Sequence, residues 1–395
     1  MHHLSQARVH QALYRERSPI HVQKIKYNNN IYCSRYMKAL ILYFSTGMGH
    51  KNPAIAIAKA LGKRCKTKVL DCADLGIPDV EKSLTGFWKF SLAHPFVLRI
   101  LYAISDNIAV ARLGLWLHEK KVAKRLKPYI SKMKPDIIVA THMTAAAGAA
   151  KAGYPAKVVT TEPFNVHALW AVCGAEEYLV PSEPVKSELR RRGVKVPITV
   201  TGYPLNPDFT KISRSRQSIR KELGLREGKL SILFTGGGEG ISNAEELVKK
   251  LKEVQANMDF VIICGKNRVL YERLINFKCD KPRLIIKGFV DKMNEHIFAV
   301  DMVAGKAGAN TVLEALVMCK PFCCTHVMAN EEPLSDYVVR NGFGWKTIKP
   351  NEFADLAMRL TNRRNELNTA IKKLSKANIK SGADEIARHL LSQAC

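Results

Sequence analysis

The sequence has few acidic side chains and no long hydrophobic run. Its 62 Lys and Arg residues stand against 35 Asp and Glu, which gives a formal net charge of +27. The longest stretch without a charged residue, 137–150, is too short and too rich in Ala and Gly to span a bilayer. No zinc-finger spacing or RNA-recognition aromatic motif accompanies the basic charge. We therefore expect no transmembrane helix and no nucleic acid, but a phosphorylated substrate or an anionic membrane surface as partner.

Paired cysteines and carboxylate metal motifs are also missing. The ten cysteines form no framework, and the cluster of Cys319, Cys323 and Cys324 lies at a helix end and in an apolar strand, which predicts buried free thiols in a reducing cytoplasm. There is no Asp-x-Asp pair for a metal-chelated sugar nucleotide. A Walker loop is excluded because Asn267 follows Gly265-Lys266, and the first glycine loop lacks the third glycine of a dinucleotide fingerprint. We expect no bound metal and no cofactor.

What the sequence does have is a regular alternation of strands and helices. With 395 residues, 47% of them hydrophobic, the chain is long enough for two domains. The alternation predicts an α/β fold of two doubly wound, Rossmann-like domains that face each other across a cleft. We expect an extension at 1–36 that is disordered or a presequence, a first domain at 37–202, a linker at 203–228 and a second domain at 229–395. The last helix, within 365–391, is expected to be able to pack back on the first domain.

A glycine loop that contains a histidine follows the first predicted strand, 39–44. Gly47 and Gly49 precede His50, and the Asn-Pro pair after them predicts a helix over 54–61. The carboxyl end of a strand in an open α/β sheet is the edge where ligands bind. An imidazole there titrates near neutral pH, which makes His50 a candidate base.

A second glycine turn occurs late in the chain, after a strand predicted at 298–303. Gly305, Lys306 and Gly308 are expected to form the turn, and a helix is predicted over 310–319. A helix start together with a lysine suits an anion, and Glu314 lies far enough into the helix to reach a sugar hydroxyl. A further loop, Gly236-Gly237-Gly238, follows the strand predicted at 230–235.

The segment 85–104 breaks this alternation with aromatic and basic residues. Phe87, Trp88 and Phe90 are predicted to contact an anionic membrane surface, since a basic amphipathic helix with aromatic side chains suits the interface. The following part, 112–130, is expected to be an ordinary helix with a solvated basic face.

Several short motifs, weak singly, occur in the order found in the GT-B glycosyltransferases. The chain resembles the group of monogalactosyldiacylglycerol synthases and processive diacylglycerol glucosyltransferases, related to the peptidoglycan lipid-linked N-acetylglucosaminyl transferase. The resemblance covers about residues 38–347. It is carried by Gly47-Met-Gly-His50, Thr160-Thr-Glu162, His167, Val180-Pro-Ser-Glu183, Thr201-Gly-Tyr-Pro204, Gly236-Gly-Gly238, Lys306-Ala-Gly308 with Glu314, and Asn330-Glu-Glu332.

The resemblance implies a UDP-sugar donor held mainly by the second domain. The backbone around Phe289 would then meet the uracil and Glu314 the ribose, with both second-domain glycine loops beside the diphosphate. Glu331 and Glu332 would meet the sugar hydroxyls. A membrane lipid, diacylglycerol in the first place, would enter from the first domain, where Gly47, Gly49 and His167 lie on the substrate side. Such an enzyme would work as a peripheral protein at the cytoplasmic face of a membrane.

Displacement of UDP requires a base for the acceptor hydroxyl and stabilisation of the leaving diphosphate. Lys306 and a helix N-terminus can supply the second without a metal. For the base we rank His50 first, with Glu162 as an orienting group or alternative base. His167 has the alternative role of structuring its loop.

Departures from the group's usual motifs leave the sugar and the acceptor open. Met48 replaces a glycine, Glu162 an aspartate, and Asn330-Glu331 a Gly-Gln pair. Three alternatives therefore remain: N-acetylglucosaminyl transfer to a polyprenyl-linked precursor, a non-hydrolysing UDP-sugar epimerase, and a non-catalytic UDP-sugar-binding subunit.

Overall fold

The computed structural model describes residues 37–45, 47–93, 95–237 and 243–393. The extension predicted at 1–36 lies outside the described residues, and so does Gly238. The side chains of Phe87 and Trp88 are likewise not described.

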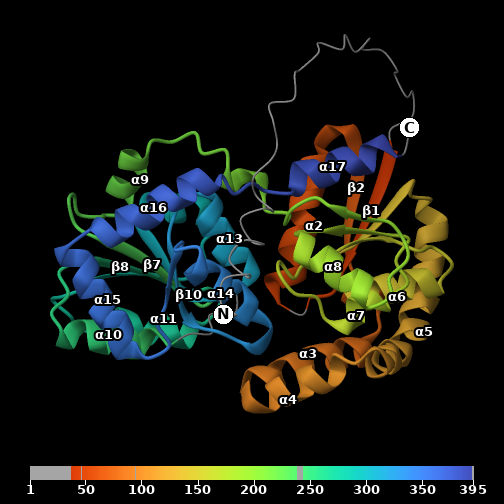
Figure 1. The fold of residues 1–395 in the computed structure, drawn as a ribbon, viewed down its shortest axis with the longest axis horizontal. Helices are drawn as coiled ribbons and strands as arrows, with labels where there is room; N and C mark the ends of the chain where they lie inside the picture. The colour runs from red at the N-terminus through yellow and green to blue at the C-terminus, as the bar shows by residue number, and fades with distance from the viewer. Residues whose placement is uncertain (1–36, 46, 94, 238–242, 394–395) are drawn as a thin grey trace, which may run out of the picture. The chain divides into compact units, whose positions relative to one another are not determined.

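The described chain contains two parallel six-stranded sheets, each covered by helices (Figure 1). The first sheet has the order β2-β1-β3-β4-β5-β6 and the second β12-β11-β10-β7-β8-β9. All pairings are parallel, and the central strands are apolar on both faces, as parallel strands covered by helices must be. This is the predicted fold class.

The first sheet and its connections run from residue 37 to residue 222. The strands are β1 (Met37–Tyr43), β2 (Cys65–Asp71), β3 (Ile137–Ala140), β4 (Lys157–Val159), β5 (Glu177–Val180) and β6 (Ile198–Val200). The helices are α2 (Met48–Leu61), α3 (Pro78–Ala93), α4 (Pro95–Ser105), α5 (Ile108–Met133), α6 (Met143–Lys151), α7 (Ala168–Ala171) and α8 (Glu183–Arg191), with short 3₁₀ turns η1 (Gly62–Arg64) and η2 (Cys72–Leu75). The connection to the second sheet contains the 3₁₀ turn η3 (Pro207–Phe209) and helix α9 (Arg216–Glu222), which pack with the hydrophobic core of the second sheet.

The second sheet and its helices occupy the rest of the described chain. The strands are β7 (Ser231–Thr235), β8 (Asp259–Ile263), β9 (Arg283–Lys287), β10 (Met302–Lys306), β11 (Phe322–His326) and β12 (Gly344–Lys346). The helices are α10 (Ala244–Glu253), α11 (Arg268–Ile275), α12 (Met293–Ala299), α13 (Ala309–Val317), α14 (Glu332–Arg340), α15 (Pro350–Asn362), α16 (Asn365–Ala377) and α17 (Ala383–Ser392), with the 3₁₀ turn η4 (Ala329–Glu331).

Each sheet has one point at which its strand order changes direction. In the first sheet β1 lies between β2 and β3, so the chain departs to both sides of β1. In the second sheet the same happens at β7, which pairs with β8 and β10. A switch point of this kind opens a crevice at the carboxyl ends of the strands. The two predicted glycine loops of the second sheet follow β7 and β10, the strands between which its order reverses.

Helix α17 covers part of the first sheet although it follows the second in the chain. Ile386, Ala387 and Leu390 are fully buried with Ile41 and Val139 in one hydrophobic cluster. Figure 1 shows α17 lying over α2 beside β1 and β2. The chain therefore passes between the sheets twice, after β6 and again after α16. The domain boundaries given above stay a prediction.

Two helix boundaries differ from the sequence prediction. The first helix begins at Met48, not at Ala54, because Gly47 turns the chain with φ 96°, a conformation that favours glycine, and Pro53 then lies inside the helix. The predicted helix over 365–391 is two helices. It breaks after Asn378, whose φ of 48° is the left-handed C-cap conformation.

Two strands also differ. The strand predicted at 298–303 is β10, which begins at Met302, because Phe298 still belongs to α12. The short edge strand β12 was not predicted. Three residues including a lysine carry little hydrophobic pattern, and short, charged strands are typical of sheet edges.

No single helix among the described residues has the length and apolar character needed to cross a membrane. Residues 99–105 of α4 and helix α5 meet the length and composition criteria only as a pair, which is bent by 93°.

Candidate active site

The start of α2 and the start of α13 meet through one asparagine. The side-chain amide of Asn310 donates to the carbonyl oxygen of Met48 at 2.9 Å. Its oxygen accepts from the Tyr203 hydroxyl at 2.7 Å. The loop that contains His50 and the turn that contains Lys306 are thereby brought to one place from the two sheets.

His50 lies in the first turn of α2 and is fixed by the ends of neighbouring strands. Its Nδ1 is 2.7 Å from the carbonyl oxygen of Thr141 and 3.0 Å from the Thr161 hydroxyl. Because a carbonyl oxygen can only accept, Nδ1 carries the hydrogen and Nε2 is the basic nitrogen. Burial lowers the pKa of His50 to about 4, although the bond to Thr141 opposes this shift. The ring is therefore neutral at pH 7.

Glu162 follows Thr161 and is held by a backbone group. Its Oε2 accepts from the backbone N–H of His167 at 2.8 Å. Burial raises the pKa of Glu162 to about 7, and the bond from His167 opposes the rise. This carboxyl group is thus balanced between its two protonation states near neutral pH.

His167 connects its loop to the end of α4. Its Nδ1 accepts from the backbone N–H of Leu169 at 3.2 Å, which caps α7, and its Nε2 lies 3.1 Å from the Ser105 hydroxyl. The Tyr102 ring lies 4.7 Å from the His167 ring, centroid to centroid. Both ring nitrogens are therefore engaged in local structure, which fits the loop-structuring alternative.

On the second sheet, Lys306 ends β10 and pairs with a buried carboxylate. Its Nζ is 2.9 Å from Oε1 of Glu331, whose Oε2 accepts from the backbone N–H of Met328 at 3.1 Å. Gly308 is the N-cap of α13. Gly305 has φ 151°, and a β-carbon there would lie 2.0 Å from the carbonyl oxygen of Thr235, so only glycine allows β10 to approach β7 here.

The other predicted donor residues lie around this turn or farther out. Glu314 is buried on α13, and burial raises its pKa to about 7. Gly236 is buried, and the backbone N–H of Gly237 donates to the Thr235 hydroxyl at 3.2 Å. Phe289 is 58% exposed after β9. Glu332 begins α14 and forms an ion pair with Arg99 of α4.

Some residues of the site were not predicted. Thr141 and Thr161 fix His50, and Asn310 joins the two loops. His326 ends β11, where its carbonyl oxygen accepts from the N–H of Ala307 at 2.9 Å. The threonines and His326 lie at or just beyond the carboxyl ends of strands, so the rule that ligands bind at that edge would have found them.

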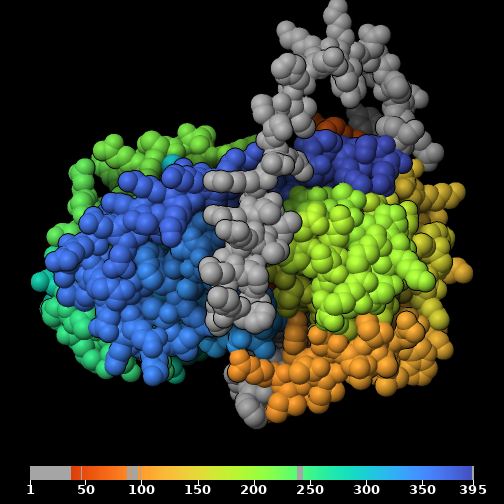
Figure 2. Space-filling model, viewed as in Figure 1, coloured from red at the N-terminus to blue at the C-terminus, as the bar shows by residue number. Residues whose placement is uncertain are grey.

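An exposed apolar face lies on the first half of α5 and on α4. Phe90 on α3 is 46% exposed, as a membrane contact would require. Large exposed apolar side chains continue along α4 and α5: Val97, Ile100, Ile104, Val110, Leu113, Trp116 and Leu117. The last three lie within 112–130, where an ordinary helix with a solvated basic face was expected. The ammonium group of Lys120 lies 5.6 Å from the centre of the Trp116 ring. Figure 2 shows the described parts of α3 and α4 as an orange surface.

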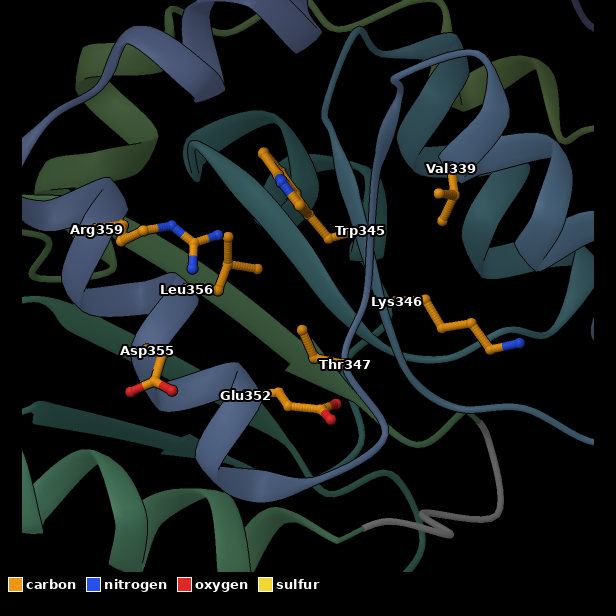
Figure 3. A pocket seen from close by; sticks show the side chains of 8 residues that line it. All are labelled: Val339, Trp345, Lys346, Thr347, Glu352, Asp355, Leu356 and Arg359. Atoms are coloured by element: carbon orange, nitrogen blue, oxygen red, sulfur yellow. The ribbon is translucent and has the colours of Figure 1, made fainter.

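A separate hollow lies at the far edge of the second sheet (Figure 3). Side chains of β12 and α15 line it, among them Trp345, Lys346, Glu352 and Arg359. It contains none of the predicted site residues. Among the residues that the structure describes, no group of three His, Cys, Asp or Glu side chains is placed to hold a metal ion.

Two family models match the chain, one for each sheet. Residues 50–205 match the model described as monogalactosyldiacylglycerol (MGDG) synthase, and residues 231–386 match the glycosyltransferase family 28 C-terminal domain. A probable chloroplastic monogalactosyldiacylglycerol synthase of Nicotiana tabacum is 28% identical over 341 residues, which are 81% of this chain. The chain spans 63% of that relative's length.

Solved structures agree on the fold. Acinetobacter baumannii MurG aligns with a TM-score of 0.56 and 14% identity over 90% of this chain and 99% of its own. The Neisseria meningitidis UDP-GlcNAc 2-epimerase bound to UDP-GlcNAc aligns with a TM-score of 0.57 and 14% identity over 90% of this chain and 100% of its own. The GT-B fold and the resemblance to the monogalactosyldiacylglycerol synthase group are confirmed.

Proposed function

We propose that this chain, which matches the monogalactosyldiacylglycerol synthase and family 28 glycosyltransferase models on its two sheets, transfers a hexose from a UDP-sugar to the hydroxyl of a membrane lipid. The acceptor we favour is diacylglycerol. The reaction would be a single, metal-independent displacement that inverts the anomeric carbon.

The observation that carries this proposal is the contact between the start of α2, which contains the neutral His50, and the start of α13, which follows Lys306. Nε2 of His50 would take the proton of the lipid hydroxyl as its oxygen attacks the anomeric carbon. The bond from that carbon to the UDP oxygen breaks at the same time. The N-terminus of α13 and Lys306 would stabilise the negative charge that develops on the leaving diphosphate.

The remaining predicted residues would contact the donor or the acceptor. Gly236, Gly237 and Gly308 would lie beside the diphosphate, with Phe289 at the uracil and Glu314 at the ribose. Glu331 and Glu332 would meet the sugar, and Gly47 and Gly49 the substrate side of the first sheet.

The apolar face of α4 and α5 supports a peripheral position at a membrane surface, which we propose to be the cytoplasmic face. Exposed Trp116 and Leu117 with nearby cations such as Lys120 suit an interface with anionic lipid. A UDP-sugar epimerase of the same fold acts on a soluble substrate and has no use for such a face. The face also suits a polyprenyl-linked acceptor, so the acceptor must be settled by assay.

The test is a radiolabelled transfer assay with UDP-glucose, UDP-galactose and UDP-N-acetylglucosamine. Diacylglycerol in mixed micelles and a polyprenyl-linked acceptor are offered separately, with and without EDTA. We expect a labelled diacylglycerol glycolipid that forms equally with EDTA. Conversion of UDP-N-acetylglucosamine into its 2-epimer, without any glycolipid, would identify the epimerase instead, and product only from the polyprenyl acceptor would replace diacylglycerol.

Binding to vesicles tests the membrane face separately. Trp116→Ser and Phe90→Ser should each reduce cosedimentation with anionic vesicles. Ile275→Ser is the matched control, because Ile275 is an equally exposed apolar residue, 51% exposed, on α11 of the second sheet. Equal binding of all three variants and the wild type would mean that α3 to α5 form an ordinary solvated surface and do not contact the membrane.

A further inference from the structure

Helix α4 carries part of the exposed apolar face and also contacts the predicted sugar end of the donor site. Val97, Ile100 and Ile104 are three and four residues apart and therefore share one side of α4, where each is exposed. Arg99 instead pairs with Glu332, 233 positions later in the sequence. Helix α4 also packs against η4, the turn that contains Glu331.

The neighbouring carboxylates Glu331 and Glu332 are held from different sheets. Glu331 is paired with Lys306 within the second half of the chain, and both side chains are largely buried. Glu332 is paired with Arg99, which comes from the first half and is 63% exposed, against 42% for Glu332. One of the two predicted sugar contacts is therefore positioned by the helix that also carries the apolar face.

We propose that Arg99 is a positioning residue that couples lipid contact by α4 to binding of the donor sugar. This inference rests on the proposed function. An exposed ion pair contributes little to stability, so the Arg99–Glu332 contact can form and open readily. Lipid that holds α4 in place favours the closed contact and fixes Glu332 for the sugar hydroxyls.

Coupling of this kind is reciprocal. If lipid increases the affinity for the UDP-sugar by some factor, the UDP-sugar must increase the affinity for lipid by the same factor. UDP alone, which lacks the sugar, should show no such effect, because Glu332 is placed at the sugar end. A cation that only attracts the protein to an anionic membrane would produce no difference between UDP-sugar and UDP.

The experiment compares the donor KM in two acceptor forms. One is a short-chain diacylglycerol in solution, and the other is diacylglycerol in saturating anionic vesicles. For the wild type we expect vesicles to lower the KM for the UDP-sugar about fivefold, the lower end of typical coupling. Arg99→Ala should give the same, higher KM in both forms with kcat nearly unchanged. Arg99→Lys, which retains the charge, should restore part of the vesicle effect.

Arg112→Ala is the matched control, since it removes an exposed cation of α5 for which no partner in the described structure is known. It should retain the vesicle effect, and both variants should bind UDP as the wild type does. A vesicle effect that persists in Arg99→Ala would overturn the inference and leave the proposed function intact.

A wild type that transfers no hexose would contradict the proposed function instead. In that case vesicle cosedimentation with UDP-sugar or with UDP still decides the coupling. Stronger vesicle binding with UDP-sugar only, lost in Arg99→Ala, would support the role of Arg99, and no difference would reject it.

Discussion

Two pairs of polar residues in two regions of the molecule, His50 with Glu162 and Lys306 with Glu331, are stabilised in different ways. At the carboxyl ends of β1, β3 and β4, His50 and Glu162 are held by neutral groups, a carbonyl, a hydroxyl and a backbone N–H. Burial favours the neutral form of both, because it lowers the pKa of His50 and raises that of Glu162. Around β10 and β11, Lys306 and Glu331 hold each other as opposite charges. An imidazole must be neutral to accept a proton, so the lowered pKa suits His50 as the base, whereas the raised pKa of Glu162 favours its protonated form, which cannot accept one. The partner of a diphosphate must instead carry charge, which is the role proposed for Lys306.

The largest effect should come from removing the base of the first region. His50→Ala should lower kcat by about 10²–10⁴-fold, the usual contribution of a positioned base, while calorimetric UDP binding is unchanged. His118→Ala on α5 is the control histidine. Transfer at the wild-type rate by His50→Ala would assign the proton transfer to Glu162.

The next largest effect should come from breaking the charged pair of the second region. Lys306→Met should weaken UDP binding about 10–100-fold, because a hydrogen bond to a charged group contributes about 1.5–3 kcal/mol. It also leaves Glu331 buried without this cation, so the melting temperature should fall. Lys306→Met combined with Glu331→Gln should recover the melting temperature but not the affinity. Recovery of both would mean that Lys306 serves only the fold.

The pH dependence distinguishes the two candidate bases of the first region. With a pKa of about 4, His50 stays neutral as the pH falls from 8 to 6, so kcat/KM should stay level. With a pKa of about 7, Glu162 would protonate over the same range, and kcat/KM would fall tenfold per pH unit below 7. We expect the level profile, measured with vesicles at constant ionic strength.

The same shifts act on stability with opposite signs. The raised pKa of Glu162 makes the folded state lose stability as the pH rises from the ordinary value of 4.5 to about 7. The lowered pKa of His50 makes it lose stability as the pH falls from 6.5 to about 4. Glu162→Gln should therefore raise the melting temperature more at pH 8 than at pH 5.

The smallest effect should come from the contact that joins the two regions. Asn310→Ala removes one bond to Met48 and one to Tyr203, which together contribute about 1–3 kcal/mol. We expect a lower melting temperature and a severalfold loss in kcat/KM. Asn294→Ala is the matched control, since its amide also donates to a backbone carbonyl, that of Asp208. An equal change in kcat/KM for both variants would contradict a role of Asn310 in joining the two parts of the active site.

The sequence was sufficient to predict those strands whose burial produces a continuous run of apolar residues. Strands such as β1, β7 and β8 are buried along most or all of their length, and their mainly apolar sequences indicate this burial. The two glycine turns and His50 could be found because they follow such strands. Their roles in catalysis and donor binding stay predictions.

The rest depends on contacts between distant parts of the chain. The start of α2 is set by the backbone of Gly47, while the nearby Asn52-Pro53 pair imitates a helix start. The break before α17 comes where Gly382 lies against Gly202, so that a β-carbon at Gly382 would be 2.2 Å from the Gly202 carbonyl oxygen. The pairing of Arg99 with Glu332 joins residues 233 positions apart, and no local sequence pattern predicts it.

The position of α17 has a consequence for synthesis on the ribosome. The face of the first sheet that contains Ile41 and Val139 is covered in part by Ile386, Ala387 and Leu390. Translation proceeds from the N-terminus, so this part of the earliest sheet must wait, uncovered, until nearly the whole described chain has emerged. Exposed apolar surface in a nascent chain is prone to aggregation. We therefore expect the growing polypeptide to need chaperone protection longest over β1 and β3, which are made long before the helix that covers them.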